Sequence, residues 1–386
     1  MSRPASGRGS PPPRRRSLLD WKAAVGILIS SAALYFTFRR MDLADVVREL
    51  RAADPLLLGL SAAIVTFVFW IRAWRWRAIL EPVADTTFRS RLAAVTIGFM
   101  GNNLLPARVG EFMRAYALSR LEPVPLVASF ASLVIERLFD GALVIALLFV
   151  ALSLPAFPAF SGAESIALPG FGQSFTIAGL ARGMGFLVGG VMLLLLALVL
   201  FPRRAVAAFE RVLAVLPDTF RRPLIDALEA FLSGVGVLRN PLLLLRTGSW
   251  SAVLWLTNAL GCWIAFRAFG YDLPFAAALF FQSAIALAVS VPSAPGFVGV
   301  YHGMATFVLA SLWDQPLASA GAFAVGFHLA GFIPVTLIGL YYAWHTGMSL
   351  RDATDSETVV EEAVEHAVEE AAADDIAADR DPEAAG

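Results

Sequence analysis

The stretch Gly101-Asn-Asn-Leu-Leu-Pro-Ala-Arg-Val-Gly-Glu-Phe-Met-Arg114 decides how we expect the chain to fold. The apolar run before it, residues 92–100, is shorter than the roughly 20 residues that cross a hydrocarbon core. The asparagine pair, Pro106 and Gly110 then interrupt the helical pattern. We therefore predict a re-entrant hairpin. Because interrupted backbone at membrane depth survives only where protein or water satisfies its polar groups, the hairpin should line a cavity.

The composition of the whole chain indicates a membrane protein. Of its 386 residues, 58% are hydrophobic and 16% are charged, and the mean hydropathy is +0.69. This apolar content exceeds what one soluble core requires. A single cysteine, Cys262, excludes an internal disulfide and a cysteine-based zinc site. We predict an all-α polytopic integral membrane protein.

Three regions follow from the charge pattern. Residues 1–17 are rich in Ser, Pro, Gly and Arg, which predicts a disordered basic arm. Residues 18–347 form the predicted transmembrane domain. Residues 348–386 form an acidic, mostly disordered tail, since positions 351–386 hold 13 acidic and 2 basic residues. An export signal is the alternative for the first apolar segment, but no small-residue cleavage site follows it.

The apolar segments predict about six full spans, an interfacial helix over residues 39–53, and two interrupted hairpins. The Trp-Arg sequence at 72–77 is typical of a membrane boundary. Residues 155–181 contain no Lys or Arg and are placed outside, whereas the arginine-rich segment 202–247 is placed inside, as amphipathic helices on the inner leaflet. Both termini are then cytoplasmic. The predicted spans are 21–38, 55–70, 125–154, 183–201, 248–269 and 317–345.

The second interrupted hairpin, residues 275–313, repeats features of the first. Its two short apolar runs flank a turn that we expect to be shaped by Pro292, Pro295, Gly296 and Gly299. Pro295-Gly-Phe-Val-Gly299 matches Pro106-Ala-Arg-Val-Gly110, and the topology gives the two halves opposite orientations. This pattern predicts an inverted repeat with halves 18–154 and 183–347. Two interrupted segments in corresponding positions indicate a binding site near the midplane.

Charged groups inside apolar segments supply the candidate site. The spacing of Arg108, Glu111 and Arg114 places them on one helix face, and Glu136 and Asp140 stand one turn apart. One interpretation is a structural ion pair that locks the helix to the hairpin. The other is that Arg108, Arg114 and Arg137 bind a lipid phosphate while the carboxylates orient them. The candidate substrate-binding residues are Asn102, Asn103, Arg108, Glu111, Arg114, Glu136, Arg137, Asp140, Tyr301, His302 and His328.

Some candidates have a structural alternative. Helix capping is the expected role of at least one asparagine of the pair, and an intramembrane histidine such as His328 commonly packs with a hydrogen bond instead of binding substrate. No P-loop, HExxH pair, GxSxG elbow or Cys/His metal spacing occurs in the sequence. We therefore expect no cofactor, no metal and no nucleic-acid partner.

Three motifs together resemble a known family. They are Asn102-Asn-Leu-Leu-Pro-Ala-Arg-Val-Gly-Glu-Phe-Met-Arg114, Glu136-Arg-Leu-Phe-Asp140 and Pro292-Ser-Ala-Pro-Gly-Phe-Val-Gly299. In this order they are similar to the lysylphosphatidylglycerol synthase transmembrane, or flippase-like, family over residues 20–347. The resemblance implies a prokaryotic cytoplasmic-membrane protein whose domain moves an aminoacylated phospholipid between leaflets. It does not carry over the synthase activity, which belongs to a separate soluble domain.

The leading functional hypothesis is a flippase-like carrier for a phospholipid or a lipid-linked headgroup. The expected partner is a membrane lipid with an anionic or zwitterionic headgroup, or a polyprenyl-linked one, and a transporter is favoured over an enzyme. One alternative is an intramembrane transferase acting on a lipid-linked sugar, with Glu111 or Glu136 as the base. Another is a non-catalytic partner of an envelope enzyme. A homo-oligomer stays open as a further possibility.

Overall fold

The computed structural model describes residues 21–39, 41–106, 108–154, 240–290 and 293–348. It also describes short pieces at 165–167, 174–176, 211, 356, 358–360 and 362–363. The basic arm, the predicted span 183–201, Pro292 and most of the acidic tail lie outside the described residues. So does most of the arginine-rich segment that was predicted to lie on the inner leaflet.

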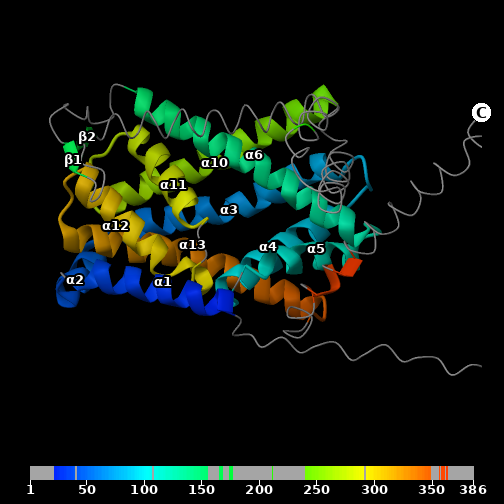
Figure 1. The fold of residues 1–386 in the computed structure, drawn as a ribbon, viewed down its shortest axis with the longest axis horizontal. Coiled ribbons are helices and arrows are strands. Elements are labelled where there is room, and N and C mark those ends of the chain that lie inside the picture. Colours follow the sequence, from blue (N-terminus) through cyan, green and yellow to red (C-terminus); the bar gives the residue numbers. More distant parts are fainter. Residues whose placement is uncertain are drawn as a thin grey trace, which may run out of the picture.

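The described chain is almost entirely helical, and most of its helices run along the long axis of the molecule (Figure 1). The first half contains α1 (Trp21–Phe38), α2 (Leu43–Ala52), α3 (Pro55–Leu80), α4 (Phe88–Leu104), α5 (Gly110–Leu121) and α6 (Leu126–Ser153). A two-stranded antiparallel sheet of β1 (Ser165–Ala167) and β2 (Ser174–Thr176) follows. The second half contains α10 (Pro241–Ala268), α11 (Phe275–Ala288), the 3-10 turn η2 (Pro295–Phe297), α12 (Val300–Leu312) and α13 (Leu317–His345).

The predicted all-α membrane fold is confirmed. Within the described ranges, four helical segments are long and apolar enough to cross a membrane: 55–80, 241–268, 295–312 and 317–345. The number of full spans, predicted to be about six, stays a prediction.

Two predicted helix boundaries were wrong. The helix that begins at Pro55 does not end near residue 70, because α3 continues to Leu80 and buries Arg72 and Arg75. Helix α10 begins at Pro241 instead of residue 248. Asn240 caps it by accepting hydrogen bonds from two backbone amides, as Asp54 does for α3. A capping side chain followed by proline fixes a helix start well, and it does so at both places.

Helices α3 and α10 pack antiparallel over their whole length. The amide of Asp54 donates to the carbonyl of Ala268 at 2.8 Å, which joins the start of α3 to the end of α10. At the opposite ends, Glu81 pairs with Arg246 at 2.7 Å. Helix α4 packs on α13, and α11 packs on α6. The contact of α4 with α13 and the contact of α11 with α6 are counterparts, in which the two halves exchange places. An inverted repeat requires this kind of packing.

Both interrupted segments have the same unusual backbone. Arg108 and Phe297 each have a φ of 58°, in the left-handed region that few residues other than glycine adopt. They occupy matching positions in the two five-residue motifs. Helix α4 turns back on α5 so closely that a Cβ added at Gly110 would overlap the carbonyl oxygen of Gly98. A glycine is therefore required at this crossing.

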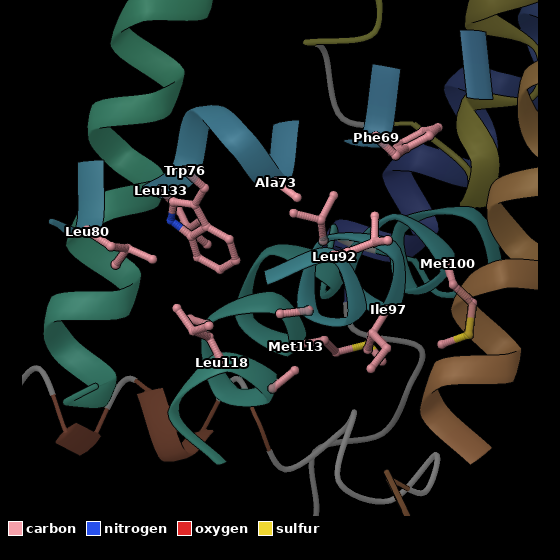
Figure 2. Packing of buried hydrophobic residues seen from close by; sticks show 14 of the residues in the cluster. Phe69, Ala73, Trp76, Leu80, Leu92, Ile97, Met100, Met113, Leu118 and Leu133 are labelled. Carbon is pink, nitrogen blue, oxygen red and sulfur yellow. The ribbon is translucent and has the colours of Figure 1, made fainter. Parts of the chain in front are cut away.

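An apolar core holds the first hairpin in place. Side chains from α3, α4 and α5 converge there, among them Trp76, Leu92 and Leu118 (Figure 2). All three are at most 4% exposed. A second core packs α12 and α13 against α10 and α11 around Phe266 and Phe323. The two hairpins are thereby fixed on opposite sides of a central space.

Candidate functional site

A cavity of about 510 Å³ lies between the two interrupted hairpins. Its volume falls within the range of small-molecule sites. Helices α3, α4, α5, α6, α10, α11, α12 and α13 all contribute to its wall. The polar lining residues are Arg72, Asn102, Asn103, Arg108, Glu111, Arg137, Asp140, Asn258, Gln282, Ser290, Tyr301 and His328. Much of the remaining wall is aromatic or aliphatic, including Phe99, Phe281, Phe297 and Phe332.

A buried ion network lies behind one wall of the cavity. Both oxygens of Glu136 accept hydrogen bonds from Arg114 at 2.8 Å, in a bidentate arrangement. Arg75 pairs with Glu136 at 2.9 Å and with Asp140 at 2.5 Å. The side chains of Arg75, Arg114 and Glu136 are at most 2% exposed. This geometry matches the structural interpretation, because the network joins α3, α5 and α6.

Arg72 faces the cavity and has looser contacts. Its Nη1 lies 3.4 Å from Glu136 and 3.3 Å from Asp140, which already accept shorter bonds. Its guanidinium lies over the ring of Phe99 at 5.0 Å. Its buried Nε has no hydrogen-bond partner. The Nε atoms of Arg75 and Arg114 also lack a partner, so Arg72 is distinguished from them by its longer contacts to the carboxylates and by its place in the cavity wall.

Arg137 and Glu111 form a second pair at the cavity wall. Their side chains meet at 2.7 Å and are 45% and 23% exposed, respectively. Arg137 also approaches Asp140 at 3.9 Å. This pair joins α5 to α6 at a partly exposed part of the cavity wall.

Arg108 lies in the break between α4 and α5 and not on the helix face predicted for it. Its guanidinium donates to the carbonyl of Val289 at the end of α11, and it lies 5.6 Å from the ring centre of Phe297. No carboxylate of the described residues is within ion-pair distance of it. Arg108 therefore contacts the opposite hairpin and forms no ion pair with a carboxylate of the described residues.

The two asparagines lie in the last turn of α4, and neither caps a helix. Asn103 donates to the hydroxyl of Thr336 at 2.8 Å, which connects α4 to α13. Asn102 is 9% exposed, and its Oδ1 has no hydrogen-bond partner. Both line the cavity.

The aromatic group beside the second hairpin is compact. Tyr301 stacks on His328 with ring centres 4.4 Å apart. His328 Nδ1 lies 3.4 Å from His302 Nε2, and the amide of Gly299 donates to His302 Nδ1 at 3.4 Å. Tyr301 and His328 line the cavity, whereas His302 lies behind them.

Eight of the predicted site residues thus line one cavity, and three lie behind its wall: Arg114, Glu136 and His302. Both Nη atoms of Arg114 donate to Glu136 and its side chain is 2% exposed, so it is not placed to bind a headgroup in this conformation. Sequence reasoning missed Arg72 and Arg75. Their signal was present, because two arginines three residues apart lie within a continuous helical pattern, but it was interpreted as a membrane boundary.

In the part of the chain that the structure describes, no three His, Cys, Asp or Glu side chains gather closely enough to hold a metal ion. The chemistry available at the cavity is that of guanidinium, carboxylate, amide and imidazole groups.

Comparison with known proteins places these features in a family. Residues 23–339 match the family model described as the lysylphosphatidylglycerol synthase TM region. The chain is 29% identical over 332 residues to a protein named Glycosyltransferase AglD from Haloferax volcanii, covering 81% of this chain and 52% of that protein. It is 30% identical over 128 residues to a UPF0104 membrane protein from Methanothermobacter thermautotrophicus, covering 33% and 35% of the two chains. The chain therefore spans about half the length, or less, of these relatives.

Proposed function

The chain belongs to the family of the lysylphosphatidylglycerol synthase TM region, and on this premise we propose that it is a flippase-like carrier. It moves a phospholipid or a lipid-linked headgroup between the leaflets of the cytoplasmic membrane. The family and the named relatives support a lipid-related function in a membrane, with a multi-pass location. We propose in addition that both termini are cytoplasmic and that the lipid moves between the leaflets.

The observation that carries this proposal is a charged cavity between two oppositely oriented hairpins. A charged side chain at the centre of a membrane helix costs about 2.5–3.5 kcal/mol on insertion scales. A charged residue with this cost is retained because it has a partner or a function. The cavity brings three such residues together: Arg72, Arg108 and Arg137. Guanidinium groups bind phosphate oxygens in pairs, which suits a lipid headgroup.

The fold also supplies a means of alternating access. In carriers built from inverted repeats, one repeat rocks against the other around a fixed central site. Here the hairpins meet through Arg108, which contacts Val289 and Phe297 of the second hairpin. A headgroup that competes for this guanidinium would loosen the contact between hairpins. Binding and opening would then be coupled.

The test is lipid translocation in reconstituted vesicles. Purified chain is inserted with fluorescent phospholipids or lipid-linked sugars, and the labelled lipid that a membrane-impermeant quencher reaches is followed over time. The proposal predicts translocation that Arg108→Ala and Arg137→Ala reduce at least tenfold. Arg246→Ala is the matched control, because this arginine forms an exposed pair away from the cavity. Absence of translocation for every native lipid, or no effect of the two cavity variants, would refute it.

A second candidate is a transferase acting on a lipid-linked sugar, which the name of the 29% identical relative favours. Glu111 is the better base of the two predicted carboxylates, since it is 23% exposed at the cavity whereas Glu136 is 1% exposed and held by arginines. Product formed by purified chain from a labelled lipid-linked donor, and lost in Glu111→Gln, would support this candidate. A role as a non-catalytic partner predicts instead that deleting 1–17 and 352–386 abolishes function.

A further inference from the structure

The arginines and carboxylates at the cavity do not balance in charge. The cavity wall and the network behind it contain five arginines and three carboxylates among the described residues. The arginines therefore exceed the carboxylates by two. The members are Arg72, Arg75, Arg108, Arg114 and Arg137, against Glu111, Glu136 and Asp140.

The short contacts show which two arginines are in excess. Arg114 takes both oxygens of Glu136 at 2.8 Å, Arg75 takes Asp140 at 2.5 Å, and Arg137 takes Glu111 at 2.7 Å. Arg75 also pairs with Glu136 at 2.9 Å, so these three arginines make the ion-pair contacts below 3 Å to the three carboxylates. Arg72 is left with contacts of 3.3 Å and longer, and Arg108 with a backbone carbonyl. Both of these remaining guanidinium groups line the cavity.

Their surroundings favour an anion. Arg72 lies against Phe99 and Arg108 against Phe297, so aromatic rings cover one side of each guanidinium. Low polarity around a charge strengthens its attraction to an opposite charge.

The same pairing argues against an amine in the ligand. Glu111 and Asp140 are the two carboxylates that line the cavity, and arginines hold both. An ammonium group would have to displace one of these arginines to find a counter-charge. A zwitterionic headgroup has no net charge, so it would not neutralise the excess positive charge of Arg72 and Arg108. A cationic headgroup would be repelled by these arginines.

We infer that the cavity selects a lipid whose headgroup carries two or more negative charges, a prenyl diphosphate or a terminal phosphomonoester, with Arg72 and Arg108 as its ligands. This assignment rests on the proposed carrier function for its physiological meaning, but it concerns binding alone. Each guanidinium would donate two N–H groups to phosphate oxygens. The apolar wall formed by Phe281 and Phe332 would contact the first carbons of the chain.

The test is equilibrium binding to full-length chain in detergent. The probes are farnesyl diphosphate, farnesyl monophosphate, short-chain phosphatidylglycerol, phosphatidylethanolamine and lysylphosphatidylglycerol, with tryptophan fluorescence as the signal. The expected order places the two farnesyl phosphates at least tenfold tighter than phosphatidylglycerol, with the zwitterionic and cationic lipids weakest. Equal or tighter binding of phosphatidylethanolamine or lysylphosphatidylglycerol overturns the inference, and this comparison needs no variant.

Three variants sharpen the result. Arg108→Gln and Arg72→Gln should each weaken farnesyl diphosphate binding at least tenfold and phosphatidylglycerol binding less. Glu111→Gln releases Arg137 and raises the excess charge to three, so it should tighten farnesyl diphosphate binding severalfold. A merely structural role for Glu111 predicts no tightening. Unchanged diphosphate binding in Arg108→Gln, which lies in a turn and not in the packed network, overturns the assignment.

The outcomes separate this inference from the proposed function. Selective diphosphate binding without translocation in vesicles would refute the carrier and leave the headgroup assignment standing. Translocation of phosphatidylethanolamine at a rate that excess farnesyl diphosphate does not reduce would refute the headgroup assignment and leave the carrier standing.

Discussion

Replacing Glu136 with glutamine tests whether the buried network holds the site together. The carboxylate is 1% exposed and has three contacts below 3 Å, two from Arg114 and one from Arg75. Glutamine keeps the shape and one acceptor oxygen, but its NH₂ group meets a donor of Arg114. At least one charge-assisted hydrogen bond is lost, each worth about 1.5–3 kcal/mol, and Arg114 is left buried without a carboxylate. The expected cost is about 3–5 kcal/mol, as for other broken buried pairs.

The measurement is the free energy of unfolding by titration with sodium dodecyl sulfate in mixed micelles, followed by tryptophan fluorescence. Glu81→Gln is the matched control, because Glu81 also meets an arginine at 2.7 Å but is 48% exposed. It should cost at most about 1 kcal/mol. The double variant Arg114→Gln with Glu136→Gln should cost about 2 kcal/mol less than the sum of its singles. Equal costs for Glu136→Gln and Glu81→Gln, or strict additivity in the double variant, would refute the reasoning.

Two further predictions concern the hairpins and the helix pairing. Gly110→Ala should destabilise the protein by about 1–3 kcal/mol because its Cβ would overlap the Gly98 carbonyl. Gly59→Ala is the control and should cost nothing, since there is open space around this glycine. Thermal unfolding compares the two variants, and a harmless Gly110→Ala would contradict the close crossing of α4 and α5. Cysteines placed at Glu81 and Arg246 should be joined by a short thiol cross-linker. Cysteines at Glu81, just after α3, and at Asp272, just after α10, should not be joined, and cross-linking of this second pair would exclude antiparallel packing.

The sequence predicted the fold where local patterns dominate. Proline, glycine and asparagine located the first break, and the matching motif located the second, since both positions require a turn. Long apolar runs predicted α6 and α13 to within a residue or two.

What the sequence missed depends on distant partners. Arg72 and Arg75 are tolerated inside α3 only because α6 presents Glu136 and Asp140 to them, across more than 60 residues of chain. Periodicity carries no information about such pairing. For the same reason the sequence could not show that Arg114 is occupied by Glu136, whereas Arg108 is left without a carboxylate. The three-dimensional arrangement of the charges decides which arginine is held by a carboxylate and which can bind a ligand.

Arg108 should then show a signature of a residue retained for function. Its φ of 58° costs an ordinary side chain about 1–2 kcal/mol, which glycine does not incur. Arg108→Gln and Arg108→Gly both remove the guanidinium, so they should impair lipid translocation equally. However, the glycine variant should be about 1 kcal/mol more stable than the glutamine variant, after allowing for the greater entropy of glycine in the unfolded chain.

Arg137 provides the opposite control for this argument, because it lies within α6. There glycine should be about 0.5–1 kcal/mol less stable than glutamine, following ordinary helix propensity. The free energy of unfolding of the four variants checks the change of sign between the two positions. Glycine that destabilises at both positions would mean that the left-handed turn at Arg108 stores no strain. Arginine at position 108 would then carry no conformational cost. Its position between the hairpins would be an ordinary consequence of packing, and not a sign that it is retained for function.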